Sequence, residues 1–266
     1  MKIIYILPFL ALLLISSLTL SQDSVNINIR DYDISRFQKV KLYLNVLDKS
    51  GTPINNLDSS SFSISEKETG KKTAPHVENF YSSTEPMAIL FSIDASNSMF
   101  GPPLDNVKEG ILKIISDFRK DDKMGIAYFH DDFYKKASFD TDRDVLRNNI
   151  KELQTGGSHT ELFKGAVESI KWLSSLPEPK RKILVLISDG EDNGDTYKID
   201  DVVNEVKKSG LTVYTIGSTS EDAGFLINMQ KIAEASLDGK YYKISKPDDI
   251  KVIIQPYMRE SKVNIY

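Results

Sequence analysis

The chain has no cysteine among its 266 residues. This absence excludes disulfide bonds, thiolate metal sites and cysteine nucleophiles, although it leaves the compartment open because exported proteins need no disulfides. Internal repeats and low-complexity tracts are also absent. Hydrophobic residues make up 40% of the chain and charged residues 27%, which is ordinary for a globular protein and excludes a disordered or fibrous one.

A surplus of positive charge is missing as well. The chain has 34 lysine and arginine residues against 38 aspartate and glutamate residues, which gives a net charge of −4 at pH 7. No basic stretch with interleaved aromatic residues occurs. Because nucleic-acid binding depends on neutralising phosphates, this composition argues against a nucleic-acid partner.

The first residues predict export. An apolar stretch, Ile3–Ile15, follows a single lysine and gives way to small and polar residues. This pattern predicts a secretory signal peptide over residues 1–21 that is cleaved before Gln22. The alternative is an uncleaved membrane anchor, since Ile3–Leu20 approaches the roughly 20 residues that a span needs, although Pro8 and several hydroxyl residues weaken it. Both interpretations place the rest of the chain outside the cytoplasm, as a secreted, periplasmic or cell-surface protein.

Residues 22–84 have the pattern of a small β-rich module. Apolar and polar residues alternate in Val25–Ile29 and again in Val40–Val46, which is typical of half-buried strands. Turn residues follow in Asp48–Gly51. A module of this size buries little apolar surface alone, so we expect a small β-sandwich-like unit that packs on a larger domain.

From residue 85 to residue 258 the pattern changes to strands that alternate with helices. This alternation predicts an α/β domain with a doubly wound, mostly parallel sheet. Lys182–Ser188 is the most apolar of the expected strands and should be central, whereas Tyr134–Phe139 is more polar and should form an edge. The other expected strands are Met87–Asp94, Met124–Phe129, Leu211–Ile216 and Lys240–Ile244. The expected helices are Leu104–Phe118, Arg143–Leu153, Leu162–Leu176, Ile199–Ser209, Gly224–Ala235 and Pro247–Met258.

One stretch combines a buried strand with a polar end. In Met87–Met99 a continuous apolar run leads into Asp94, Ser96 and Ser98. The run fits a parallel strand that is covered on both faces, and the carboxyl end of such a strand is where open α/β sheets bind their ligands. Carboxylate and hydroxyl oxygens are hard donors, so they favour Mg²⁺, Mn²⁺ or Ca²⁺ over zinc or copper.

Two later loops have a comparable setting. Gly156–Leu162 places Thr160 before a helix, and Ile187–Asn193 places Asp189 after an apolar strand. Together with the Asp-x-Ser-x-Ser motif at residues 94–98, these loops resemble the metal-ion-dependent adhesion site (MIDAS) of the von Willebrand factor A (vWA) family. The β pattern upstream also resembles the segment that precedes this domain in many secreted bacterial members.

The resemblance implies a Rossmann-like vWA fold and a role for each residue of the site. Ser96, Ser98 and Thr160 would be direct ligands through neutral hydroxyl oxygens. Asp94 and Asp189 would hold coordinated waters and accept hydrogen bonds from the serines, and direct coordination by one of them stays open. The cation, which would be Mg²⁺ or Mn²⁺ with Ca²⁺ as an alternative, would keep an open position for an acidic side chain of a protein partner.

We therefore expect a monomeric, non-enzymatic binding protein that captures a protein partner. One alternative is a metal-dependent phosphohydrolase, but Ser96 stands where a DxD motif would have its second carboxylate, and Met87–Pro103 contains no lysine or arginine. Another alternative is a structural or assembly scaffold with a non-essential metal site. The sequence does not identify the partner.

Several polar residues near the motifs have two interpretations each. Glu191, Asp192 and Asp195 would hold a second cation or be solvated loop carboxylates. His159 lies beside the expected ligand threonine and is either a rim residue or an ordinary surface histidine. His130 has no histidine or cysteine at ligand spacing, so we assign it no role.

The end of the chain repeats the alternating pattern of its beginning. Lys262–Tyr266 alternates polar and apolar residues in the manner of Val25–Ile29. An isolated strand gains too little burial to become ordered, so we predict that residues 259–266 form a strand that pairs with the β module. The alternative is a frayed tail.

Overall fold

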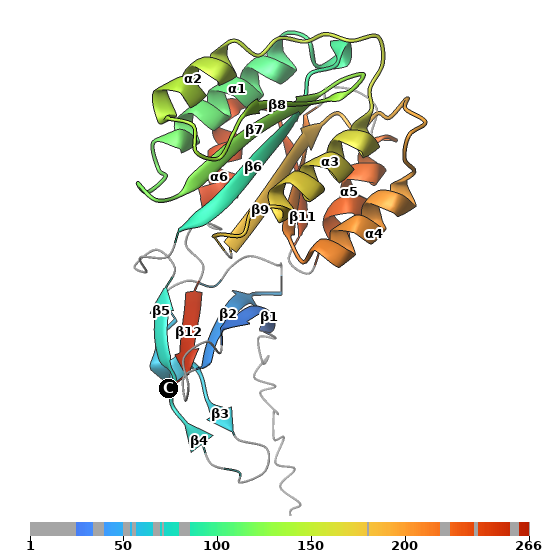
Figure 1. Ribbon diagram of the computed structural model, residues 1–266. Coiled ribbons are helices and arrows are strands. Elements are labelled where there is room, and N and C mark those ends of the chain that lie inside the picture. Colours follow the sequence, from blue (N-terminus) through green and yellow to red (C-terminus); the bar gives the residue numbers. More distant parts are fainter. Residues whose placement is uncertain are drawn as a thin grey trace, which may run out of the picture.

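The computed structural model describes residues 25–33, 40–49, 54, 57–65, 70, 72–79, 86–179, 181–218, 224–236, 239–255 and 261–265. The predicted signal peptide, residues 1–21, lies outside the described residues. Figure 1 shows an α/β domain and a smaller sheet, which lies beyond the amino-terminal ends of the domain's strands. Among the described residues, no helix is both long and apolar enough to cross a membrane.

The α/β domain is built on a six-stranded sheet with the order β11-β10-β9-β6-β7-β8. Its strands are β6 (Met87–Asp94), β7 (Lys123–Phe129), β8 (Phe133–Ala137), β9 (Arg181–Ser188), β10 (Thr212–Ser218) and β11 (Lys240–Ile244). Five strands are parallel, and β8 pairs antiparallel with β7 at one edge. This arrangement confirms the predicted doubly wound, mostly parallel sheet, with β9 central and the more polar β8 at the edge.

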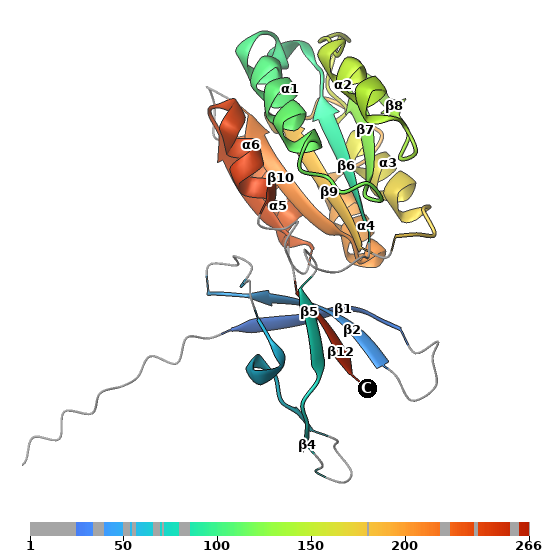
Figure 2. The ribbon, with the colours of Figure 1, turned by 90° about the vertical axis from the view of Figure 1, so that its left-hand side faces the viewer.

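Helices cover both faces of this sheet (Figures 1 and 2). One face carries α1 (Pro102–Ile115), α2 (Arg143–Lys151) and α6 (Pro247–Ile254). The other face carries α3 (Leu162–Ser174), α4 (Ile199–Ser209) and α5 (Leu226–Glu234). The two layers explain why the central strands are apolar at successive positions and not only at alternate ones.

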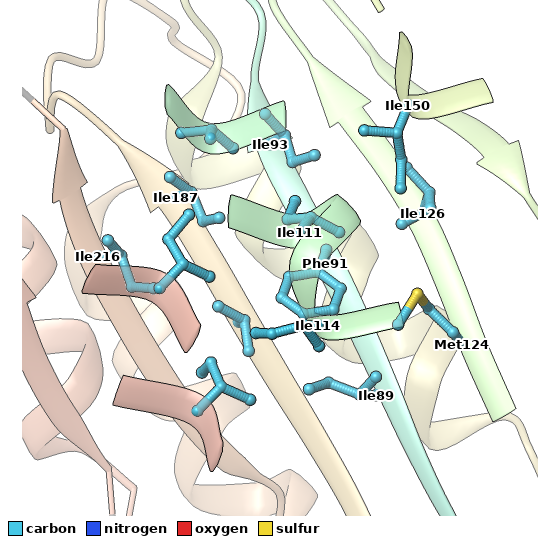
Figure 3. Close-up of a cluster of buried hydrophobic side chains, with 14 of the residues drawn as sticks. Ile89, Phe91, Ile93, Ile111, Ile114, Met124, Ile126, Ile150, Ile187 and Ile216 are labelled. Atoms are coloured by element: carbon cyan, nitrogen blue, oxygen red, sulfur yellow. The ribbon is translucent and has the colours of Figure 1, made fainter. Parts of the chain in front are cut away.

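Strand β6 shows this two-sided burial most clearly, because all eight of its residues are buried. Ile89, Phe91 and Ile93 face the cluster under α1, which Figure 3 shows with Ile111 and Ile114. Ala88 and Leu90 belong to the cluster on the opposite face. Truncating a fully buried phenylalanine such as Phe91 to alanine typically costs about 3–5 kcal/mol, so the strand that carries the Asp-x-Ser-x-Ser motif is firmly held.

The helix ends differ from the expected ones where proline and glycine set the boundary. Helix α1 begins at Pro102, two residues before the expected Leu104, because proline suits the first helical turn, where its missing N–H is not needed. Gly101 precedes it with a φ of 77°, a conformation that favours glycine. Helix α6 ends at Ile254, short of the expected Met258, because Pro256 has no backbone N–H to continue the helical hydrogen bonds, although Gln255 before it keeps an α conformation.

The smaller sheet has four antiparallel strands in the order β1-β2-β12-β5. They are β1 (Asn26–Asp33), β2 (Val40–Leu47), β5 (His76–Asn79) and β12 (Ser261–Ile265). Along the chain, β2 and β5 are separated by the short helix η1 (Ser59–Ser61) and by the two-stranded pair β3 (Ile64–Ser65) and β4 (Lys72–Thr73). Leu44 and Val46 form a small apolar core here, covered by Leu42, Ile54, Leu57, Phe62 and Val77.

The last strand, β12, lies between β2 and β5 in this sheet. Lys262 is opposite Tyr43 of β2 on one side and opposite Glu78 of β5 on the other. The sheet is therefore assembled from segments that precede and follow the α/β domain in the chain. The placement of β12 ties the amino-terminal strands to the segment that leaves α6.

Candidate metal centre

Three loops meet at the carboxyl ends of β6 and β9, at the opposite end of the domain from the smaller sheet (Figure 1). The loop after β6 is tied to the loop before α3, because the Ala95 carbonyl accepts a 2.8 Å hydrogen bond from Gly156 N–H. The loop after β9 is tied to the same segment by a 2.8 Å bond from Asn193 N–H to the Thr160 carbonyl. These loops carry the five residues that the sequence selects, and the fold brings them together at the carboxyl ends of β6 and β9.

Asp94 is buried at the end of β6, and both of its carboxylate oxygens accept hydrogen bonds. Ser96 N–H donates to Oδ1 at 2.9 Å, and the Ser188 hydroxyl donates to Oδ2 at 2.6 Å. Ser188 itself accepts a 2.9 Å bond from Gly190 N–H. The motif carboxylate is thus fixed in orientation by its own loop and by the end of the neighbouring strand.

The three hydroxyl residues have different exposures. Ser96 and Thr160 are buried, whereas Ser98 is exposed, and the Ser96 and Ser98 hydroxyl oxygens are 3.0 Å apart. The short helix η2 (Asn97–Met99) turns the chain between Asp94 and α1 and brings the two serines together. Thr160 N–H donates to Asn193 Oδ1 at 3.3 Å, so that side chain helps to hold the threonine at the site.

Asp189 is partly exposed and accepts a 3.1 Å hydrogen bond from Glu191 N–H. Burial, together with the smaller effect of the negative charge of Asp189, raises the pKa of Asp94 to about 7. Two carboxylates that repel each other beside hydroxyl oxygens form a suitable donor set for a hard divalent cation, whose charge would remove the repulsion. Within the part of the chain that the structure describes, no three histidine, cysteine, aspartate or glutamate side chains are grouped so that they could hold a metal ion.

Two glycines allow the loops to approach this edge closely. Gly157 has a φ of 78°, and a Cβ atom there would lie 2.8 Å from the Cβ of His130. Gly190 has a φ of 89°, and its Cβ would lie 2.6 Å from the carbonyl oxygen of Phe225. A side chain at either position would strain the backbone and displace a loop that carries a candidate ligand.

His130, to which the sequence assigns no role, supports the loop that carries Thr160. Its carbonyl accepts a 2.7 Å hydrogen bond from Glu161 N–H, and its ring contacts Asp131 and Tyr134. Ser188 and Asn193 are further supporting residues that the sequence analysis does not select. Both lie within the expected third loop, Ile187–Asn193, so their position in the chain is a signal, but their partners are fixed only by the fold.

The acidic residues that follow Asp189 have separate environments. Asp192 accepts a 3.0 Å hydrogen bond from Phe163 N–H and so caps the start of α3, where the side chain of Glu161 makes no capping bond. Burial raises the pKa of Asp192 to about 6, and the charge of Glu161 contributes. Asp195 is exposed. These contacts favour a structural role for Asp192 over a second cation site.

Exposed aromatic side chains flank two of the loops. Phe100 follows the buried Met99 and is 77% exposed, so it stands in solvent two residues after Ser98. Phe225 is also exposed, and its backbone contacts Gly190 beside Asp189. His159 lies 3.8 Å from Glu161, measured between Nε2 and Oε1. The surface around the candidate site therefore combines apolar and polar groups.

Comparison with known proteins identifies the domain. Residues 88–256 match the model of the von Willebrand factor type A domain. The chain belongs to the von Willebrand factor type A domain family. This finding and the six-stranded sheet confirm the vWA fold that the motifs imply.

Individual relatives are distant. The chain is similar to inter-alpha-trypsin inhibitor heavy chain H3 of Pongo abelii, with 25% identity over 190 residues that cover 61% of this chain but only 22% of the relative. A manganese-loaded TRAP protein of Plasmodium vivax has the same fold, with a TM-score of 0.56, 15% identity, and coverage of 72% of this chain and 80% of that one. A mussel byssus matrix protein with a zinc-occupied MIDAS motif has a TM-score of 0.54 and 20% identity over 68% of this chain and 48% of that one. At these identities the structures establish the shared fold alone.

Proposed function

We propose that this vWA domain binds a divalent cation and, through it, a protein partner outside the cytoplasm. The observation that carries this proposal is the convergence of Asp94 and Asp189 with three hydroxyl residues at the carboxyl ends of the two central strands. The edge of an open α/β sheet at these ends is the usual place for a ligand.

Each residue has a role that fits its environment. Ser96, Ser98 and Thr160 supply neutral oxygens, so a cation held by them keeps most of its charge and attracts a carboxylate of the partner. Both carboxylate oxygens of Asp94 already accept a hydrogen bond, one from Ser96 N–H and one from the Ser188 hydroxyl. Asp94 therefore orients Ser96 and holds water that is coordinated to the cation. Asp189 is partly exposed and is free to hold water or to bind the cation directly. Hard oxygen donors favour Mg²⁺ or Mn²⁺, with Ca²⁺ as the alternative.

Two of the structural neighbours support this assignment. Manganese is bound in the Plasmodium protein and zinc occupies the MIDAS of the mussel protein. The chain matches only about a fifth of the length of the inhibitor heavy chain, so the biological partner of that protein does not carry over. Capture of an acidic side chain is the part of the assignment that rests on this chain's own residues.

The site does not favour an enzyme. A phosphohydrolase needs a carboxylate that can attack phosphorus, but Asp94 is buried and both of its oxygens accept hydrogen bonds. A scaffold role without metal would leave only protonation of Asp94, whose pKa is raised to about 7, to relieve its repulsion with Asp189. A non-enzymatic binding function is consistent with both observations.

The exposed Phe100 gives the proposed interface an apolar contact. Met99 is buried on one side of it and Gly101 with Pro102 begins α1 on the other, so the aromatic ring is held in solvent with little freedom to retract. Rigid aromatic groups near the centre of an interface often contribute most of the binding energy. We therefore expect the partner to present an acidic residue next to an apolar one.

A capture experiment tests the proposal. The purified chain is immobilised and exposed to cell-surface extract in Mn²⁺ or in EDTA, beside Thr160→Ala and Phe100→Ala. A protein retained in Mn²⁺ should be lost in EDTA and in Thr160→Ala. Phe100→Ala should weaken its retention about tenfold or more while metal affinity is unchanged. Val252→Ala, which removes an exposed side chain on α6, is the matched control. Equal retention in EDTA and Mn²⁺ would show that the partner does not bind through the metal.

A further inference from the structure

Strand β1 leaves an apolar edge of the smaller sheet uncovered. Val25, just before the strand, is 47% exposed, and Ile27 and Ile29 are 54% and 57% exposed. The strand ends the sheet order, and among the described residues it pairs with β2 alone. Its outer edge therefore offers free backbone N–H and C=O groups beside exposed isoleucines.

These side chains continue the apolar face of the small core. Ile27 is opposite Val46 and Ile29 is opposite Leu44 in the antiparallel register, so each pair shares one face of the sheet. Val46 and Leu44 are buried, whereas their partners on β1 are more than half exposed. The apolar side chains of the small core are therefore buried on β2 but exposed to solvent on β1.

The sequence of this edge is symmetric about its centre. Residues 25–29 read Val-Asn-Ile-Asn-Ile, which is apolar, Asn, Ile, Asn, apolar in either direction. Charged residues and proline usually protect an edge strand from pairing, and this stretch has neither. Arg30 follows, and the register of β1 shifts between Ile29 and Asp31, so the unprotected edge is confined to these five residues.

We propose that two copies of this chain pair through β1, antiparallel about a twofold axis at Ile27. Val25 would then lie opposite the partner subunit's Ile29, and Ile27 opposite the partner subunit's Ile27. The isoleucines would extend both apolar faces across the junction and join two four-stranded sheets into one. Self-complementarity of this kind is the property that a twofold interface requires.

The dimer differs from the monomer expected from the sequence, because the sequence alone does not show which strand ends the sheet. About five residues a side is small compared with the roughly 20–30 of a standard interface, so we expect a dimer that dissociates on dilution. The smaller sheet lies at the other end of the molecule from the metal centre (Figures 1 and 2). Two metal centres would remain accessible in one dimer, which would raise avidity for a surface with repeated partners.

The absence of cysteine makes a direct test available. A disulfide spans Cα separations of 4.4–6.8 Å, and directly opposed residues of antiparallel strands lie within this range. Mild oxidation should therefore convert Ile27→Cys into a covalent dimer. Val25→Cys should not crosslink with itself, because its position faces residue 29 of the other copy, but should crosslink when mixed with Ile29→Cys. Val145→Cys, at a position that is 49% exposed on α2, is the matched control.

Sedimentation of the unmodified chain supplies the second readout. We expect a concentration-dependent dimer at roughly 100 µM, the range of weak associations, that is lost in Ile27→Lys and kept in Val145→Lys. Ile27→Cys crosslinking no faster than Val145→Cys, or a dimer that survives Ile27→Lys, would overturn the proposal. Binding of a monomer to phosphatidylethanolamine–phosphatidylglycerol vesicles, lost in Ile27→Lys, would assign the edge to a lipid surface instead. Stabilisation by Mn²⁺ should be equal in Ile27→Lys and the unmodified chain, which separates this test from that of the metal centre.

Discussion

The hydroxyl of Ser188 donates a 2.6 Å hydrogen bond to Oδ2 of Asp94, although the two residues are 94 positions apart in the chain. The bond joins the carboxyl ends of the two central strands, β6 and β9, whose preceding residues Ile93 and Ile187 are in register. It fixes the motif carboxylate in the orientation that Ser96 N–H also requires. The proposed metal centre therefore depends on the pairing of the strands as well as on its five expected residues.

Ser188→Ala should weaken metal binding without removing a candidate ligand. Loss of a hydrogen bond to a group that orients a metal site typically reduces affinity about 10- to 100-fold. Calorimetric titration with Mn²⁺ measures the change. Ser92→Ala is the control, because Ser92 lies on the same strand and is bonded to Ser169 at 2.8 Å. It should lose about 1–3 kcal/mol of stability and keep its metal affinity, and an equal loss of affinity in both variants would contradict the role of Ser188.

Gly157→Ala should destabilise the fold and weaken metal binding together. The left-handed conformation alone costs about 1–2 kcal/mol for alanine, and the contact with His130 adds to it. Gly210→Ala is the matched control, because Gly210 has a φ of 64° with open space around its Cβ position. Urea unfolding of both variants should show the larger loss in Gly157→Ala. Equal losses and unchanged Mn²⁺ affinity would show that the loop tolerates the side chain.

Asp192 predicts a pH dependence of stability. Its pKa is raised to about 6 in the folded protein, above the roughly 3.9 of an unfolded chain. A group with a raised folded pKa stabilises the fold below the unfolded pKa, and that stabilisation is lost as the pH rises through 6. The unfolding free energy of Asp192→Asn should therefore increase relative to the unmodified chain between pH 4 and pH 7, by about 1–2 kcal/mol since the group is partly hydrated. Urea unfolding in EDTA at four pH values measures it, and parallel profiles would refute it.

Deletion of residues 261–266 should damage the smaller sheet and leave the metal centre intact. The deletion removes the strand between β2 and β5, so it should expose Leu44 and Val46 and cost about 2 kcal/mol or more of local stability. Limited proteolysis followed by mass spectrometry should locate new cleavages before residue 80. Unchanged protease resistance would show that β12 does not hold the sheet together. Mn²⁺ titration of the same variant is the internal control.

The sequence predicts most of the α/β domain because its signals are local and strong. Met87–Asp94 is apolar at nearly every position, which only a doubly covered strand explains, and the structure confirms it. The expected order of strands and helices follows from the same alternation. Helix ends are less predictable, as at Pro102, because a proline that could break a helix can also begin one.

The supporting residues of the site could not be predicted from the sequence. Ser188, His130 and Asn193 act through partners that lie far away in the chain, so no spacing rule selects them. In the sequence Asp192 belongs to an acidic cluster, whereas in the structure its carboxylate accepts a hydrogen bond at the start of α3. The free edge of β1 likewise depends on which strands pair with β2.

Calorimetric titration of the chelated, dialysed chain with Mn²⁺ tests the central claim most directly. We predict that one Mn²⁺ binds per chain and that Asp94→Ala abolishes binding while the variant stays folded, since Asp94 is the last residue of β6 and lies beyond the apolar residues of the strand. Asp195→Ala removes an exposed carboxylate from the loop after β9 and should bind Mn²⁺ as the unmodified chain does. Undiminished Mn²⁺ affinity in Asp94→Ala would contradict the assignment of the metal centre.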